Sequence, residues 1–172
     1  WHMATFEIAV GQWEAALTRF ENHILPVATH TCDALTDAPA MLWRLQLAAP
    51  RPVTLPWEPV RATAVHRLTH PSGPYVELHC LLALAGAGDI EGLDRWLLGR
   101  PATEDPRAKL LAQMGVGLRA FAADDYDLSA VVLAAAVPRL SELGGSHAQN
   151  LLFQEIAELS GDRAQMTTRI AA

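Results

Sequence analysis

The sequence predicts an all-α protein, an α-solenoid of about five antiparallel helical hairpins in a single domain that spans residues 1–172. Three observations support this fold class. Strand signals are nearly absent, because β-branched runs are short and apolar residues do not alternate with polar ones over any length. Apolar residues instead recur at three- and four-residue spacings, which is the pattern of one helix face. A turn signature also repeats at intervals near 36 residues, which is typical of a helical repeat protein.

The turn signature is a small or acidic residue, a polar residue and a bulky residue, followed three positions later by a small or apolar residue. It occurs at 11–16, 88–93 and 124–129, with a shortened copy at 161–164. The first interval is 77 residues, about two periods, so one hairpin between these copies has an irregular turn. Prolines between Pro50 and Pro59 forbid a continuous helix and mark that turn. Because one hairpin cannot bury its apolar face alone, we expect stacked hairpins with a continuous core.

Helix boundaries follow from the apolar spacing and from these turns. We expect the first helices of the hairpins at 2–10, 38–49, 74–86, 106–123 and 147–160. We expect the second helices at 13–25, 56–68, 89–98, 126–142 and 162–171. Gly115 lies inside a predicted helix, where it is expected to permit close helix packing.

Capping residues support several of these helix starts. Asp105 is a favoured N-cap and Pro106 fits the first helical position, and Gly73-Pro74 is a similar start. Ser146 and Gln149 have the spacing of a capping box, in which each side chain bonds the backbone N–H of the other residue. The two glycines before Ser146 suit the left-handed end of the preceding helix.

Composition and charge exclude several classes of function. Apolar residues make up 51% of the chain and charged residues 19%, which is typical of a globular domain. The net charge of −6 argues against a nucleic-acid partner, which requires a basic surface. The longest apolar run, Ala130–Val137, is far too short to span a membrane, so no membrane partner is expected.

The cysteines and the N-terminal residues indicate the setting of the chain. Cys32 and Cys80 form no CxxC motif, so we expect reduced, packed thiols and neither a disulfide framework nor a zinc site. No signal peptide is visible, and the expected location is cytoplasmic. The helical pattern begins at Trp1 without an initiator methionine, and we interpret the chain as a fragment of a longer protein. A missing N-terminal region or another chain is then expected to cover one face of the first hairpin, formed by Phe6, Trp13 and Leu17.

Four segments carry a family resemblance. They are Trp1-His2-Met3-Ala4, residues 37–45 (D-x-x-x-M-L-W-R-L), residues 75–84 (Y-V-E-L-H-C-L-L-A-L) and residues 144–149 (GGSHAQ). In this order they resemble segments of the tetratricopeptide repeat protein 38 family, where the last stretch reads GGSHAQRD. The chain departs from that pattern at Asn150-Leu151, which replaces Arg-Asp, and at Val76-Glu77, which replaces Asn-Asp. The resemblance implies a tetratricopeptide-like solenoid and a longer parent protein, of which this chain matches about the C-terminal half.

Histidines stand out among the candidate functional residues. His2, His79 and His147, three of the seven in the chain, lie in these segments near the N-terminal ends of predicted first helices. First helices line the concave surface of such solenoids, so we expect three imidazoles to face one groove. The helix dipole disfavours their protonated forms there. No two histidines have the local spacing of a metal site, so neither a metal nor another cofactor is expected.

The first functional hypothesis is a binding module whose concave groove presents a His/Arg/Glu polar cluster to a peptide, a partner protein or a small ligand. In this hypothesis Arg44, Glu77, His79 and His147 meet in one cluster on the concave side. The candidate ligand-binding residues are Asp37, Arg44, Glu77, His79, Ser146, His147 and Gln149.

The second hypothesis is an enzyme domain. His79 or His147 would then act as the acid or base, Glu77 would orient an imidazole, and Arg44 would hold an anionic substrate.

The third hypothesis is structural. The same polar groups would form a buried network that locks the helices together, with Arg44 paired to Asp37, Glu77 or Glu155. Capping alone would then explain Ser146 and Gln149. Trp1 and Trp43 are expected in the core, since large aromatic side chains dominate core burial.

Overall fold

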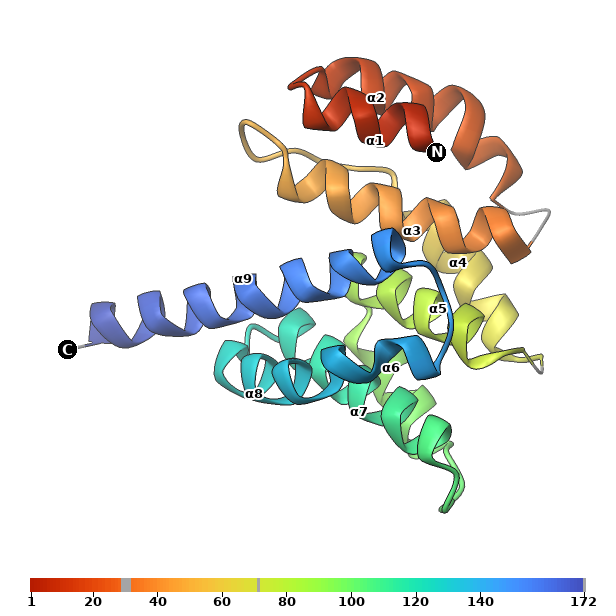
Figure 1. Cartoon of the computed structure of the whole chain (residues 1–172), viewed down its shortest axis with the longest axis vertical. Coiled ribbons are helices and arrows are strands. Elements are labelled where there is room, and N and C mark those ends of the chain that lie inside the picture. Colours follow the sequence, from red (N-terminus) through yellow and green to blue (C-terminus); the bar gives the residue numbers. More distant parts are fainter. Residues whose placement is uncertain (29–31, 71, 172) are drawn as a thin grey trace.

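A computed structural model describes residues 1–28, 32–70 and 72–171 of the 172-residue chain, without the side chains of 32–34 and 170–171. Every regular element in these ranges is a helix (Figure 1), as predicted. The α-helices are α1 (His2–Ala9), α2 (Trp13–Arg19), α3 (Cys32–Leu47), α4 (Trp57–Leu68), α5 (Pro74–Gly86), α6 (Ile90–Leu98), α7 (Pro106–Ala122), α8 (Tyr126–Ala136) and α9 (His147–Ala171). Shorter helical turns are η1 (Phe20–Ile24), η2 (Leu25–Val27) and η3 (Val137–Glu142). No helix in these ranges is long and apolar enough to cross a membrane.

The repeated turn signature has a common backbone geometry in the two middle copies. Gly88 and Asp124 adopt φ of +70° and +57°, in the left-handed region that glycine and aspartate tolerate. The next residues, Asp89 and Asp125, cap α6 and α8: each carboxylate accepts from the backbone N–H three residues later, at 2.8 and 3.2 Å. The signature is therefore a chain reversal followed by an N-cap.

Predicted caps elsewhere are confirmed. The Ser146 N–H donates to Gln149 Oε1 at 2.8 Å, and the Gln149 N–H donates to Ser146 Oγ at 3.3 Å, which together make the capping box of α9. Gly144 and Gly145 just before it have φ of +115° and +83°. Asp105 caps α7 by accepting from a backbone N–H at 3.0 Å.

The prediction of a fifth hairpin is wrong. Gly161 and Asp162 lie inside α9, which continues as one helix from His147 to Ala171. Ile156, Ser160 and Ala164, spaced by four residues on one face of α9, are all buried. Ser160 also shares a hydrogen bond of 2.9 Å with Ser129 of α8. A single helical glycine costs only about 1 kcal/mol, so packing of this face outweighs the turn signal.

Other predicted boundaries shift where local chemistry intervenes. The predicted helix 38–49 begins at Cys32 as α3 and passes through Pro39. The predicted helix 13–25 stays α-helical only to Arg19 and continues as η1 and η2. The predicted helix 126–142 ends as α8 at Ala136 and continues as η3, because Pro138 has no N–H to donate.

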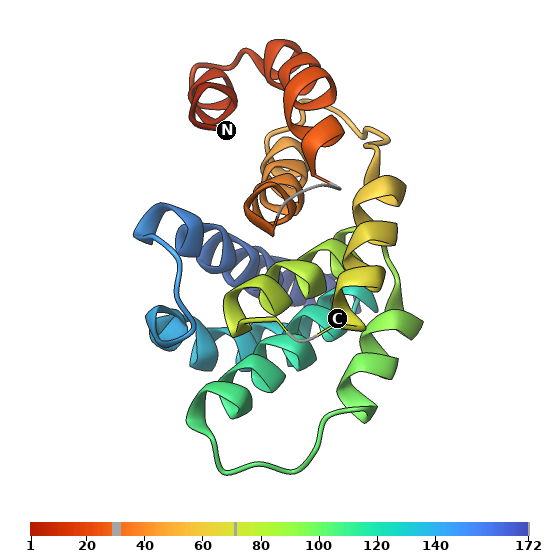
Figure 2. The ribbon, with the colours of Figure 1, turned by 90° about the vertical axis from the view of Figure 1, so that its right-hand side faces the viewer.

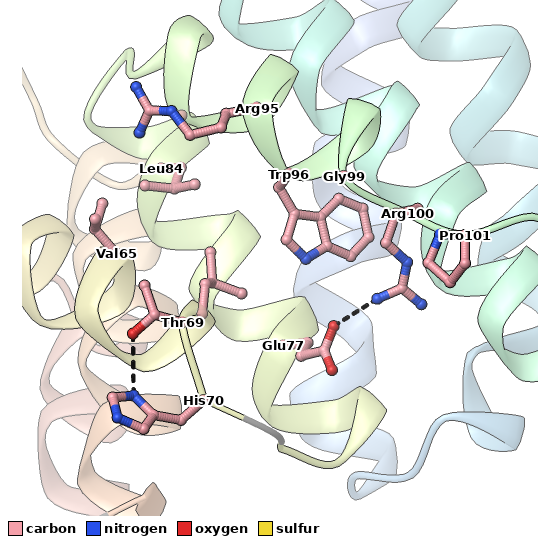
Figure 3. Close-up of a pocket in the computed structure, with 12 residues that line it drawn as sticks. Val65, Thr69, His70, Glu77, Leu84, Arg95, Trp96, Gly99, Arg100 and Pro101 are labelled. Atoms are coloured by element: carbon pink, nitrogen blue, oxygen red, sulfur yellow. Dashed lines mark hydrogen bonds and ion pairs between the residues drawn. The ribbon is translucent and has the colours of Figure 1, made fainter.

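Two of the hollows on the surface of the described residues lie between helices. The first, about 490 Å³, lies between α4, α5 and α6 and is here called the α4/α5/α6 pocket (Figure 3). The second, about 780 Å³, lies between α8, η3 and α9 and is here called the α8/α9 groove.

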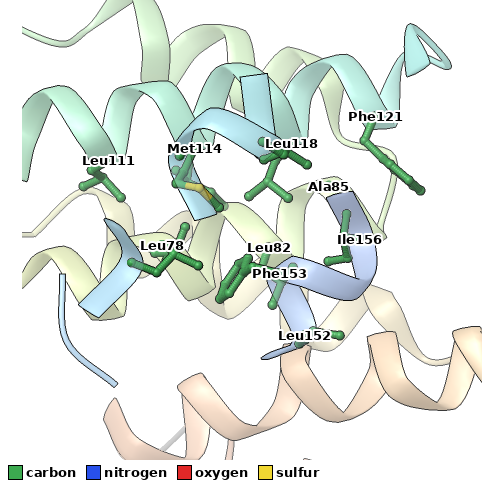
Figure 4. Close-up of a cluster of buried hydrophobic side chains, with 14 of the residues drawn as sticks. Leu78, Leu82, Ala85, Leu111, Met114, Leu118, Phe121, Leu152, Phe153 and Ile156 are labelled. Atoms are coloured by element: carbon green, nitrogen blue, oxygen red, sulfur yellow. The ribbon is translucent and has the colours of Figure 1, made fainter. Parts of the chain in front are cut away.

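The apolar core has two parts that share α3 and α5. One part joins α5, α7, α8 and α9 around residues such as Leu82, Met114 and Phe153 (Figure 4). The other joins α1 to α5 around Phe20 and Met41. Further core side chains drawn in Figure 4 are Leu78, Ala85, Leu111, Leu118, Phe121, Leu152 and Ile156.

Several side chains have the packing roles predicted for them. Trp43 is buried, and its Nε1 donates to the Leu82 carbonyl at 2.9 Å, whereas Trp1 is only partly buried. A Cβ added to Gly115 would lie 2.7 Å from the Trp96 ring, so this glycine does permit close packing of α6 and α7. Cys80 is buried as expected, and the side chain of Cys32 lies outside the described residues.

Helix α9 covers the surface where an open groove was predicted. Figures 1 and 2 show α9 packed on α8, the preceding helix, with its N-terminal part reaching α3 and α5. Its residues Leu152, Phe153 and Ile156 are buried in the same cluster as Leu78 and Leu82 of α5. The open groove is therefore replaced over α5 by a packed helix, because an apolar stripe on α9 matches the apolar face of α5.

The N-terminal end exposes a different face from the one predicted. Of the three residues named for it, only Phe6 is exposed. Trp13 donates from Nε1 to the Leu45 carbonyl at 2.7 Å, and Leu17 packs on the core. Met3 and Val10 are exposed beside Phe6. Coverage of this end by another segment or chain stays a prediction.

Candidate functional site

Polar side chains from α3, α5 and α9 converge where α9 crosses the two earlier helices; we call this place the α3/α5/α9 junction. It contains Arg44 of α3, Tyr75 and His79 of α5, and Asn150 of α9, with Trp1 beside it. Tyr75 and His79 are four residues apart and therefore share one face of α5. The glycine turn before α9 brings Asn150 to the same place, where it lies beside Gly145 and Tyr75.

Arg44 ties α9 to α3. Its Nη2 donates to the Ala148 carbonyl at 2.8 Å, and its Nη1 donates to the Ala40 carbonyl at 3.3 Å. The guanidinium also stands 5.4 Å from the centre of the Trp1 ring, within the range of a cation–π contact. Burial lowers the pKa of Arg44 and the nearby Glu155 carboxylate opposes that change, so the side chain remains a cation.

His79 is fully buried and neutral. Its Nδ1 lies 2.9 Å from the Tyr75 carbonyl, which can only accept, so Nδ1 carries the proton and Nε2 carries a lone pair. Nε2 has no hydrogen-bond partner among the described residues. The ring packs between Tyr75 at 4.4 Å and Phe153 at 5.7 Å, centre to centre. Burial, and to a lesser extent Arg44, lowers the pKa of His79 to about 4.

Tyr75 and Asn150 add two further buried polar atoms. The Tyr75 hydroxyl and Asn150 Oδ1 have no hydrogen-bond partner in the described part of the chain. A Cβ on Gly145 would lie 2.5 Å from Tyr75 Cε2 and 3.1 Å from Asn150 Oδ1, so both side chains pack closely against the backbone of Gly145. Asn150 Nδ2 donates to the Gly144 carbonyl at 3.4 Å, which directs Oδ1 as the acceptor. Burial and the nearby Asp37 raise the pKa of Tyr75 to about 12, so its hydroxyl stays protonated.

The predicted cluster of Arg44, Glu77, His79 and His147 does not form. Glu77 is two residues from His79 and so points away from it around α5; it pairs with Arg100 at 2.8 Å in the α4/α5/α6 pocket. His147 is exposed and lines the α8/α9 groove. Only Arg44 and His79 are brought to one place.

The remaining candidates have separate positions. Asp37 is half-buried on α3 and acts on Tyr75 by its charge. Ser146 and Gln149 are engaged in the capping box, as the structural hypothesis predicts. His2 is exposed, with its ring 5.1 Å from that of Trp1. Among the described residues, no three His, Cys, Asp or Glu side chains are grouped to hold a metal ion. His30 lies outside those residues.

Sequence reasoning missed Tyr75 and Asn150. Tyr75 had a usable signal, since it is four residues before His79 and lies in the same quoted segment. No sequence signal indicated Asn150, because its place in the junction depends on α9 crossing α3.

No family model matches the chain, and no solved structure matches it.

Proposed function

We propose that the chain is a tetratricopeptide-like binding domain related to the tetratricopeptide repeat protein 38 family, and that it binds a small, neutral polar ligand at the α3/α5/α9 junction. One observation carries the proposal. His79 Nε2, the Tyr75 hydroxyl and Asn150 Oδ1 are buried polar atoms without a partner in the described residues. Leaving such atoms unpaired costs about 1–3 kcal/mol each, so three at one place favour a bound partner.

The proposed kinship is supported by where the four quoted segments lie. Trp1 of the first segment contacts Arg44 of the second at 5.4 Å. Arg44 donates to the carbonyl of Ala148 in the fourth at 2.8 Å. Gly145 of the fourth segment lies against Tyr75 of the third. Segments far apart in sequence thus surround one site, which is the expected arrangement if the resemblance reflects a shared binding function.

The chemistry of the junction selects the ligand class. His79 Nε2 and Asn150 Oδ1 offer lone pairs, and the Tyr75 hydroxyl can donate or accept. The complement is a molecule with hydroxyl or N–H donors. A cation is disfavoured by Arg44, whose charge also lowers the pKa of His79, and an anion is disfavoured by the two lone pairs. A neutral polyhydroxy compound fits both constraints.

Binding is favoured over catalysis by the state of His79. A general base works best with a pKa near the working pH, whereas burial lowers the pKa of this imidazole to about 4. Glu77, the group proposed to orient an imidazole, is held by Arg100. The second proposed base, His147, is exposed in the separate α8/α9 groove.

The two tyrosines of the chain provide a matched test. Saturation-transfer NMR is recorded on a mixture of neutral hydroxy compounds (myo-inositol, glucose, ribose and glycerol) with the wild type, Tyr75→Phe and Tyr126→Phe. We expect at least one compound to receive saturation from the wild type and from Tyr126→Phe, whose hydroxyl bonds Asp124 and Arg163 away from the junction. The signal should fall in Tyr75→Phe.

Two outcomes would contradict the proposal. Either no compound in the mixture receives saturation, or the signal is the same in Tyr75→Phe and the wild type. A stability measurement keeps the structural hypothesis separate. Because the Tyr75 hydroxyl has no partner in the described residues, its removal should change the free energy of unfolding by less than about 1 kcal/mol. A larger loss would indicate a purely structural bond.

A further inference from the structure

The α4/α5/α6 pocket combines an apolar wall with a charged rim (Figure 3). Leu84 of α5 and Val65 of α4 lie on one side, and the indole of Trp96 of α6 faces the space between them and the Glu77–Arg100 pair. The volume of about 490 Å³ is within the range of pockets that hold small molecules. The pocket is separate from the α3/α5/α9 junction, so it is independent of the proposed function.

The Trp96 ring is held in place from behind. The position of a Cβ on Gly115 of α7 would lie only 2.7 Å from this ring, so the indole packs directly on the α7 backbone. The ring is half-buried, and no hydrogen bond occupies its Nε1 in the described residues. Figure 3 shows the indole nitrogen turned toward Glu77. The indole is therefore a fixed part of the pocket wall.

The rim has an uncompensated positive charge. Arg100 pairs with Glu77 at 2.8 Å and stands 4.6 Å from the centre of the Trp96 ring. Arg95 is exposed on the same rim and has no ion-pair partner in the described part of the chain. Two arginines and one glutamate leave one positive charge at this pocket, in a chain whose net charge is −6. Charge complementarity then requires one negative charge on the occupant.

We propose that the α4/α5/α6 pocket binds a small amphipathic monoanion, an aromatic or aliphatic carboxylate or sulfonate. Its apolar body lies against Trp96, Leu84 and Val65. Its anionic group pairs with the guanidinium of Arg95, which lies on the Leu84 side of the Trp96 ring, whereas Arg100 on the other side is already paired with Glu77 (Figure 3). The unpaired Arg95 supplies the selectivity for a charged ligand over a neutral one of the same shape.

A pair of fluorescent probes separates charge recognition from simple apolar binding. The anion 1-anilinonaphthalene-8-sulfonate and the uncharged N-phenyl-1-naphthylamine share one ring system and differ by the sulfonate. Both are titrated against the wild type, Arg95→Gln and Arg51→Gln, where Arg51 is an exposed arginine far from this pocket with no ion pair in the described residues. We expect Arg95→Gln to lower the affinity for the sulfonate about three- to fivefold, which corresponds to the contribution of a partly exposed ion pair.

The uncharged probe should bind all three proteins equally. Equal affinity of the sulfonate for Arg95→Gln and Arg51→Gln would overturn the proposal. An equal loss of affinity for both probes in Arg95→Gln would also overturn it.

The place of binding is read from the tryptophan side chains. The chain has five tryptophans, whose indole N–H signals are resolved by ¹H–¹⁵N NMR, and Trp96→Phe identifies the signal of Trp96. We expect the sulfonate to shift the Trp96 signal more than the other four and to bind Trp96→Phe more weakly. A Trp96 signal that does not move while the probe binds would show that it occupies another surface, such as the α8/α9 groove, and would refute the site.

Discussion

The buried imidazole of His79 should make the protein lose stability as the pH falls. The pKa of this group is lowered from 6.5 to about 4 in the folded state, so the unfolded chain binds the proton more readily. The neutral ring contributes its stability above the unfolded pKa, and this contribution is lost as the pH falls toward the folded pKa. At about one and a third kcal/mol per pKa unit, lowering the pH from 7 to 5 should remove about 2 kcal/mol.

The perturbation is His79→Phe, which keeps a ring of similar size and removes the titrating group. The lost bond from Nδ1 is tolerable, because the Tyr75 carbonyl can also accept from the helical N–H of residue 79. Replacing an unpartnered buried polar ring by an apolar one should leave stability at pH 7 nearly unchanged or slightly raised. His23→Gln is the matched control, since His23 is exposed.

The assay is urea unfolding followed by far-ultraviolet circular dichroism at pH 7 and pH 5. Every carboxylate is common to the three proteins, so their contributions cancel when the pH-dependent losses are compared. We expect the wild type and His23→Gln to lose about 2 kcal/mol more than His79→Phe over this interval. An equal loss in all three proteins would refute the buried, neutral state of His79.

Four further substitutions test the glycine positions and one helix cap. Gly145→Ala should lower the free energy of unfolding in urea by about 1–3 kcal/mol, because φ is +83° and the new Cβ would lie 2.5 Å from the Tyr75 ring. Gly161→Ala lies inside α9 with open space around it and should raise the free energy of unfolding by about 0.5–1 kcal/mol. Equal effects of the two substitutions would contradict this prediction. Asp89→Ala should cost about 1–2 kcal/mol, since it removes the cap of α6 and the 2.9 Å contact with Arg61, and Asp89→Asn should retain the cap. Indistinguishable thermal midpoints of these last two variants would exclude the capping role.

Local features were predictable from the sequence. Asp89, Asp125 and Ser146 cap helices because a short polar side chain satisfies backbone N–H groups two or three residues away, which needs no knowledge of the rest of the chain. Trp43 was assigned to the core because large aromatic side chains dominate core burial, and the same reasoning placed Trp1 there, although Trp1 is only partly buried. The all-α class follows from the same short-range spacing.

Long-range features were not predictable. Gly161-Asp162 has a sequence typical of a turn, but packing of Ile156 and Ser160 against α8 keeps the helix continuous. At the candidate site, Arg44 and His79 were identified and Glu77 was misplaced, although two residues on a helix point in very different directions. The positions of Tyr75 and Asn150 could not be read from spacing, because they depend on the path of α9 across α3.

The hydrogen bond from Arg44 to Ala148 joins residues 104 positions apart, and this has a consequence for folding. In a linear array of repeats each unit touches only its neighbours, so such an array can fray from one end while the rest persists. Here the last helix returns to an early one, and its removal would expose the apolar face of α5 in the middle of the chain. We therefore expect residues from α3 to α9 to unfold in one cooperative transition.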